Sequence, residues 1–285
     1  MKIGKIILLV LGVALIALGV KTLMDIPAQQ AMLEAAVYLD EAVVLPENEG
    51  KLVIIHGMPE MTAPAFDEEL GLTINGIKAY RYAEEYKLIS SEKLVYKYNW
   101  QSRGQKGIVG EAVLGGFALD AKTLNAFAAD SEYDRFDAAE ISANGYVTSH
   151  GLTTEGAVTQ RLWVIVGGKY YYDAFEYSVD LDIPHVEREI SKGIAEERKG
   201  AKAYAYKVYT GNQEKTIAGI QQGNRLVADE TLGPIVRDGV VTQEQVLSAN
   251  TNGLMGGAIA FLLIGAVLIF LGIRKGSPKV NAKEA

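Results

Sequence analysis

The chain of 285 residues contains no cysteine and no Asn-x-Ser/Thr sequon. The absence of cysteine excludes a disulfide framework and a lipoprotein anchor. The absence of a sequon means that nothing points to a glycosylated eukaryotic surface domain. A bacterial or archaeal protein is therefore the simpler interpretation.

Motifs that carry catalysis are also missing: the sequence has no Gly-x-Ser-x-Gly elbow, no phosphate-binding glycine loop and no His-Glu-x-x-His. Of the three histidines, His185 has a carboxylate four residues on, at Glu189, which is zinc-ligand spacing on a helix. Acidic residues also suit a helix N-terminus for electrostatic reasons, and this structural interpretation is favoured. No catalytic residue and no cofactor are expected.

Two long apolar runs, residues 6–20 and 253–273, bracket the chain. The second has 21 residues without a charge, enough to cross a hydrocarbon core about 30 Å thick. The first is shorter, but Lys5 and Lys21 at its edges can extend their ammonium groups towards headgroups. We therefore predict transmembrane helices over residues 1–24 and 253–273.

Basic residues at the outer ends predict the orientation of the spans. Lys2 and Lys5 precede the first span, and Arg274 and Lys275 begin a basic tail over residues 274–285. The positive-inside rule then places both termini in the cytoplasm and residues 25–252 outside it. A cleaved signal peptide is the alternative for the N-terminus, but no small-x-small site follows the apolar run at the usual distance.

The net charge is −7 for the whole chain, and the two termini are basic, so about −12 falls on the remainder. Such a domain repels nucleic acid and anionic headgroups. Nucleic acid is therefore not an expected partner.

Between the spans, short β-type runs outnumber helical patterns. Residues 25–45 predict a membrane-proximal helix, and residues 46–250 predict one extracytoplasmic domain of the α+β class. Alternation of apolar and polar residues over 94–101 predicts a half-buried strand. Asp120 predicts a helix N-cap, and Thr242 with Gln245 predicts a capping box. Further segments are predicted as a loop over 58–70, strands over 51–56, 203–209 and 216–221, and a helix opened by Pro184.

Five segments in order across residues 45–250 resemble the transmembrane protein 43 family, also called LUMA. They are Asn48-Glu-Gly-Lys-Leu-Val53, Ile77-Lys-Ala-Tyr-Arg81 with Glu84 and Tyr86, Tyr96-Lys-Tyr-Asn-Trp-Gln-Ser102, Gly116-Phe-Ala-Leu119 and Gly223-Asn-Arg-Leu-Val227.

The resemblance implies a protein of internal membranes that self-associates and organises other membrane proteins, with no catalytic residue to carry over. Family members in animals have several C-terminal spans, whereas this chain has one. It would therefore be a bacterial or archaeal member with a reduced C-terminal membrane region.

Tyrosines are numerous, 15 against 7 phenylalanines. Because tyrosine has an apolar body and a polar tip, clusters of it suit partner interfaces, although a sheet core explains them as well. The clusters are Tyr170, Tyr171 and Tyr172, and Tyr204, Tyr206 and Tyr209. Arg81 and Glu84 are expected to form an ion pair if their segment is helical.

Glycines recur at steps of seven and eight residues in both apolar runs, which predicts that the two spans pack together along glycine faces. The same faces could instead join protomers, or the spacing could be coincidence. The glycines are Gly4, Gly12, Gly19, Gly257, Gly265 and Gly272, with Gly253 adding a small-xxx-small step.

The sequence therefore favours a non-enzymatic membrane protein that scaffolds itself or other membrane proteins through its extracytoplasmic domain. Its expected partners are the bilayer and membrane proteins. An extracytoplasmic metal-dependent hydrolase using His185 is one alternative. A ligand-binding sensor is another, although a 12-residue tail offers no output domain.

Overall fold

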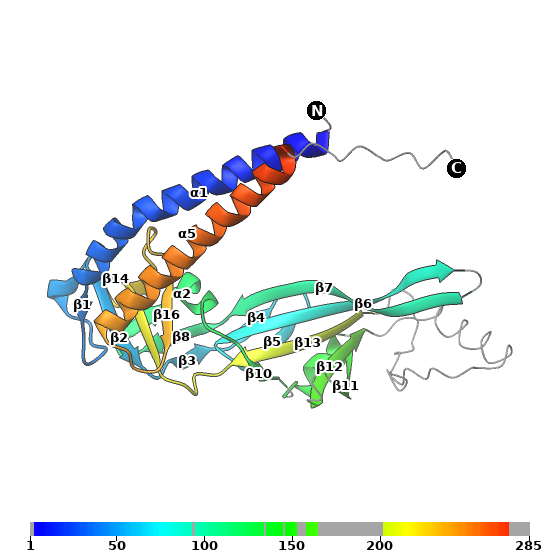
Figure 1. Cartoon of the computed structure of the whole chain (residues 1–285). Coiled ribbons are helices and arrows are strands. Elements are labelled where there is room, and N and C mark those ends of the chain that lie inside the picture. Colours follow the sequence, from blue (N-terminus) through cyan, green and yellow to red (C-terminus); the bar gives the residue numbers. More distant parts are fainter. Residues whose placement is uncertain are drawn as a thin grey trace, which may run out of the picture.

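The computed structural model describes residues 3–92, 95–133, 135–144, 146–152, 158–164 and 202–273. Strands predominate between two long apolar helices near the termini, so the α+β class is confirmed. The helices lie side by side and meet the strands at one end only (Figure 1).

The two long helices are α1 (Ile3–Glu34) and α5 (Gln243–Ile273), and both are long and apolar enough to cross a membrane. Their outward side chains are apolar: Val10, Leu263 and Phe270 are each more than 60% exposed. Water does not favour such a surface, whereas lipid chains do. The pair fits a two-pass membrane protein.

One sheet, which we call the base sheet, receives the ends of both helices. Strand β14 pairs with β2 along six residues on one side, and with β15 and β16 on the other. Two pairs, β1 with β2 and β15 with β9, are parallel. Its strands are β1 (Val37–Tyr38), β2 (Leu52–Gly57), β14 (Lys215–Gln222), β15 (Arg225–Val227), β9 (Phe117–Leu119), β8 (Glu111–Leu114), β3 (Glu60–Ala63) and β16 (Ile235–Asp238).

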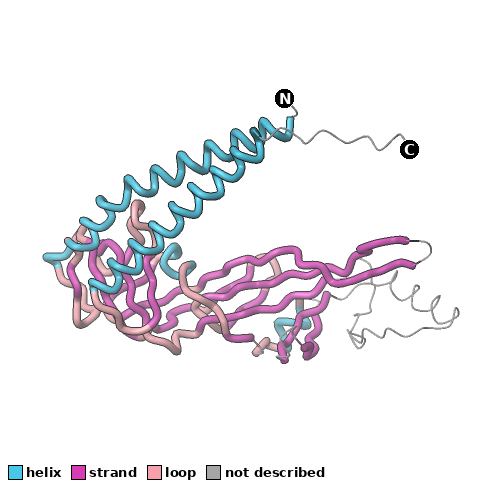
Figure 2. Tube along the Cα trace, in the orientation of Figure 1, coloured by secondary structure: helices cyan, strands magenta, loops and turns pink. Residues whose placement is uncertain are grey.

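A second, antiparallel sheet, which we call the arm sheet, extends away from the base sheet (Figures 1 and 2). Its longest strands, β6 and β7, have 15 residues each and form a hairpin that reaches furthest from the base sheet. Its strands are β11 (Tyr146–Leu152), β12 (Val158–Val164), β13 (Lys202–Tyr209), β6 (Lys78–Glu92), β7 (Val95–Val109) and β10 (Ser131–Glu132).

Smaller elements join the two sheets. A two-stranded unit, β4 (Ala65–Asp67) with β5 (Leu72–Ile74), lies between β3 and β6 in the chain. The short helices are α2 (Ala121–Asn125) and α3 (Ala138–Ala143), with a 3-10 turn over Pro46–Asn48.

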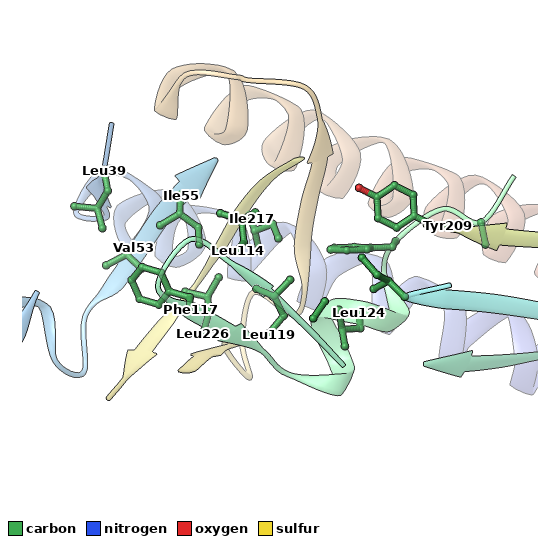
Figure 3. Close-up of a cluster of buried hydrophobic side chains, with 14 residues drawn as sticks. Leu39, Val53, Ile55, Leu114, Phe117, Leu119, Leu124, Tyr209, Ile217 and Leu226 are labelled. Carbon is green, nitrogen blue, oxygen red and sulfur yellow. The ribbon is translucent and has the colours of Figure 1, made fainter. Parts of the chain in front are cut away.

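Three apolar clusters form the core. The largest fills the base sheet and continues to α2 and the end of β13 (Figure 3). A second lies beneath the arm sheet. In the third, Leu33 of α1 and Val246 of α5 pack with Ile54, Ala218 and Ile235 of the base sheet. The helices are therefore built into the core of the base sheet.

Both predicted N-terminal caps are confirmed. The carboxylate of Asp120 accepts the backbone N–H of Thr123 at 2.8 Å and so begins α2. At the start of α5, Gln245 N–H donates to the Thr242 hydroxyl at 3.3 Å, and Thr242 N–H donates to the Gln245 side chain at 2.9 Å. This reciprocal pair is a capping box.

The segment after the first span differs from the prediction. In place of a separate helix over 25–45, α1 runs on through Pro27 and ends at Glu34. Val37 and Tyr38 then pair with β2, as suits β-branched and aromatic residues. The stop is stabilised by Gln243, whose side-chain amide donates to the carbonyl of Leu33 at 2.7 Å.

Two other segments contain strands that were not expected. The predicted loop over 58–70 contains β3 and β4, because pairing with β8 and β5 outweighs a local composition rich in acids and proline. The predicted strand over 94–101 is the first half of β7. The helix predicted after Pro184 lies outside the described residues.

Candidate functional site

Four of the glycines singled out in the sequence lie where α1 contacts α5. A Cβ atom placed on Gly12 would lie 2.8 Å from the carbonyl oxygen of Gly265, and one on Gly265 would lie 2.7 Å from that of Gly12. On Gly19 it would lie 2.9 Å from the Ala258 carbonyl oxygen, and on Gly272 it would lie 2.9 Å from Leu9. Only glycine allows the two backbones to approach this closely.

The contact keeps one register throughout. Gly12 meets Gly265 and, seven residues on in one helix and seven back in the other, Gly19 meets Ala258. The buried face of α1 continues with the same spacing through Ile26 to Leu33. A strict seven-residue repeat implies that the helices wind around each other with a left hand.

Gly4, Gly253 and Gly257 take no part in this contact, since a Cβ on any of them would meet nothing within 4 Å. The reason is their spacing: Gly4 lies eight residues from Gly12, and Gly257 lies eight residues from Gly265. Eight residues rotate a position by about 80° around the helix, whereas seven rotate it by only about 20°. Ala258, seven residues from Gly265, occupies the buried position in place of Gly257.

Polar side chains join the helices beyond their apolar halves. Gln30 donates to the Thr251 hydroxyl at 3.2 Å, and Asn250 donates to the side-chain oxygen of Gln29 at 3.4 Å. Gln29 also donates to the carbonyl of Thr231, in the loop between β15 and β16, at 3.4 Å. The same helix pair is thus held by close backbone packing in one half and by hydrogen bonds in the other.

A buried ion pair links β4 to the arm sheet. The guanidinium of Arg81 on β6 donates to both carboxylate oxygens of Asp67, at 3.0 and 2.9 Å, and also to Glu69. Asp67 accepts a further hydrogen bond from the hydroxyl of Tyr206 at 2.8 Å. The expected pair of Arg81 with Glu84 assumed a helix, and β6 is a strand, in which residues three apart face opposite sides.

Charge explains the pKa shifts of this cluster. Burial alone would lower the pKa of Arg81, but the hydrogen bond to Glu69 and the charge of Asp67 raise it above its ordinary value. The hydrogen bond from Arg81 and its positive charge lower the pKa of Glu69. Arg81 and Glu69 therefore favour their charged forms in each other's presence.

Tyr204, Tyr206 and Tyr209, which the sequence offered either as a partner interface or as part of a sheet core, are buried. They therefore belong to the sheet core. Two of them lie against cations: Arg81 is 5.5 Å from the ring centre of Tyr204, and the Lys215 ammonium is 4.6 Å from that of Tyr209. Burial raises the pKa of Tyr209 to about 12. Tyr170, Tyr171 and Tyr172 lie outside the described residues.

Lys78, at the start of β6, is a buried cation that the sequence did not reveal. Its ammonium donates to the backbone carbonyl of Asn125 at 2.7 Å and to the Asn125 side-chain oxygen at 2.8 Å, and it lies over the ring of Tyr80. Burial lowers the pKa of Lys78. Lysine is normally a surface residue, so nothing in its neighbours predicts this placement.

No metal centre emerges from the part of the chain that the structure describes, where no group of three or more histidine and carboxylate side chains is placed to hold an ion. His185 and Glu189, the candidate ligands, lie outside the described residues. The features with defined geometry are therefore the helix pair and the buried charges at the sheets.

Leucine at Gly12 and Gly265 is expected to separate α1 from α5 because each backbone fills the space that a side chain would need. The measurement is disulfide cross-linking between Ile16→Cys and Leu262→Cys, which the register places at one level. Cross-linking should fall in Gly12→Leu/Gly265→Leu and remain in Gly4→Leu/Gly257→Leu, where space is open. Equal cross-linking in both would contradict a role for the seven-residue face.

Arg81→Gln should destabilise the protein by about 3–5 kcal/mol because it leaves Asp67 buried without its cation. The control is Arg103→Gln, which removes a half-exposed partner of Glu85 and should cost about 0–1 kcal/mol. Urea unfolding in detergent, followed by circular dichroism, measures both. Similar losses of unfolding free energy in the two variants would show that the buried ion pair contributes no more to stability than the exposed one.

The raised pKa of Tyr209 predicts how stability changes in alkali. An unfolded tyrosine loses its proton near pH 10, whereas folded Tyr209 holds it to about 12. The neutral side chain therefore contributes stability in full below pH 10, and the contribution is lost between pH 10 and 12. Ultraviolet titration of wild type against Tyr209→Phe should show one tyrosinate forming near pH 12; a difference centred at 10 would refute this.

Comparison with protein-family models, with curated proteins and with solved structures found no match. The resemblance to the transmembrane protein 43 family thus stays a prediction from sequence motifs.

Proposed function

We propose that this protein is a non-enzymatic, two-pass membrane protein that organises membrane proteins. In this proposal both termini lie in the cytoplasm of a bacterial or archaeal cell and residues 25–252 lie outside it. The ectodomain assembles with other copies of itself or with other membrane proteins. No cofactor and no nucleic acid take part.

The observation that carries the proposal is the continuity of the helix pair with the core of the base sheet. Leu33 of α1 and Val246 of α5 are almost fully buried among base-sheet residues. Gln243 then joins the start of α5 to the end of α1. Because a flexible tether would suffice to keep an enzyme near a membrane, two helices built into a sheet favour a role in which position itself matters.

The motif resemblance supports the same role. Animal members of the transmembrane protein 43 family are thought to self-associate and to organise membrane proteins. The segments that carry the resemblance include β2, β9 and β15 of the base sheet and the hairpin β6–β7. Functions that belong to the additional C-terminal spans of the animal proteins are not carried over.

Alkaline-phosphatase fusions test the orientation, since this enzyme is active only outside the cytoplasm. Fusions at either terminus should be inactive. The same enzyme inserted at the exposed turn Gly223–Asn224, between β14 and β15, should be active. Activity at a terminus would overturn the assignment of sides.

Cross-linking in native membranes, followed by purification through a tag, tests the assembly. A second copy with a different tag, or a defined set of membrane proteins, should be recovered with the chain. Recovery of the chain alone would refute scaffolding. Stoichiometric zinc in the purified protein, lost in His185→Ala, would favour the metal-dependent hydrolase instead.

A further inference from the structure

The base sheet and the arm sheet meet at the backbone of one buried residue, Ile77. Its N–H donates to the carbonyl of Tyr209, the last residue of β13, at 2.8 Å. Its carbonyl accepts the N–H of Gly110, the first residue after β7, at 2.9 Å. Gly110 alone separates β7 from β8, and residues 210–214 connect β13 to β14, so Ile77 is bonded at both of these passages between the sheets.

Each passage runs through a glycine packed against another backbone. A Cβ on Gly110 would lie 2.7 Å from the carbonyl carbon of Pro64 and 2.8 Å from the nitrogen of Ala65. A Cβ on Gly211, between β13 and β14, would lie 3.1 Å from the Ile77 side chain and closer still to the carbonyl of Pro59. At both passages the backbone is therefore packed closely against another segment, which opposes a hinge there.

Side chains close the junction from the side of α2. The ammonium of Lys78, next to Ile77, donates to both oxygens of Asn125 at the end of α2. Phe127, just after that helix, packs edge-on against Tyr209 with ring centres 5.1 Å apart. A rotation of the arm sheet would break these contacts together with the two backbone hydrogen bonds of Ile77.

We infer that the arm sheet, the base sheet and the helix pair move as one rigid body. A partner that binds along β6, β7 or β13 would then be held at a fixed position relative to the helices. A force on the arm would turn α1 and α5 rather than bend the connection. The arm and the helices would be coupled in this way whether the partner is a second copy of the chain or another protein.

Pairs of spin labels measure this rigidity, and the absence of cysteine means that two introduced cysteines are labelled alone. In the full chain in detergent, Gln105→Cys with Asn224→Cys spans the arm and the base sheet. Asn224→Cys with Asn252→Cys spans the base sheet and α5, and Glu111→Cys with Asn224→Cys is the control within the base sheet. All four positions are exposed.

Pulsed electron paramagnetic resonance should give both spanning pairs distance distributions no broader than that of the control pair. A broad or two-peaked distribution for the Gln105–Asn224 pair would overturn the inference. This wild-type result decides the question even if the glycine variants fail to fold.

Gly110→Ala should broaden or shift the Gln105–Asn224 distribution because the new methyl group forces the two backbones apart. The matched control is Gly223→Asn, at a turn where a Cβ meets nothing within 4 Å and asparagine tolerates the positive φ of 59°. The control should leave the distribution unchanged. A narrow, unshifted distribution in folded Gly110→Ala would show that packing at this glycine does not fix the arm.

Discussion

The close approach of α1 to α5 is the constraint on which the rest of the structure depends. Among lipid chains no hydrophobic effect draws two helices together, so association relies on the contact of their backbones. Gly12 and Gly265 make that contact possible. Once the pair leaves its apolar half, the same face of α1 carries Ile26 and Leu33, which can bury apolar surface against side chains. One seven-residue repeat therefore provides both the backbone contact between the apolar halves of the helices and the side-chain packing against the base sheet.

The strand-rich part of the chain offsets the cost of its buried cations by placing each beside groups that replace water. Lys78 and Lys215 each lie over a tyrosine ring, and Arg81 lies beside Tyr204 while two carboxylates accept its hydrogen bonds. Removing a charge from water is costly unless such partners are fixed in advance. Tyrosine suits this role, since its ring attracts a cation and its hydroxyl still finds an acceptor, as that of Tyr206 does at Asp67.

Local rules predicted the elements whose cause is local. The caps at Asp120 and Thr242 depend on side chains within three residues, and both form as expected. The end of α1 could not be predicted in this way, because it is stabilised by Gln243, more than 200 residues away. The partner of Arg81 could not be predicted for a similar reason, because Asp67 lies on β4, which belongs to a different strand pair. The glycine faces were predicted in part: the seven-residue steps bring glycines to the contact, whereas the eight-residue steps to Gly4 and Gly257 turn too far around the helix.

These constraints act on one another through the base sheet. The helix pair can hold the sheets in place only because Leu33 and Val246 enter the same core as Ile54 and Ala218. On the same two strands, Val53 and Ile217 belong to the cluster that reaches Ile77 and Tyr209, where the arm begins. Because side chains alternate between the faces of a strand, β2 and β14 each contribute to both clusters. The two faces of the base sheet therefore connect the apolar helices, on one side, to the arm sheet, on the other.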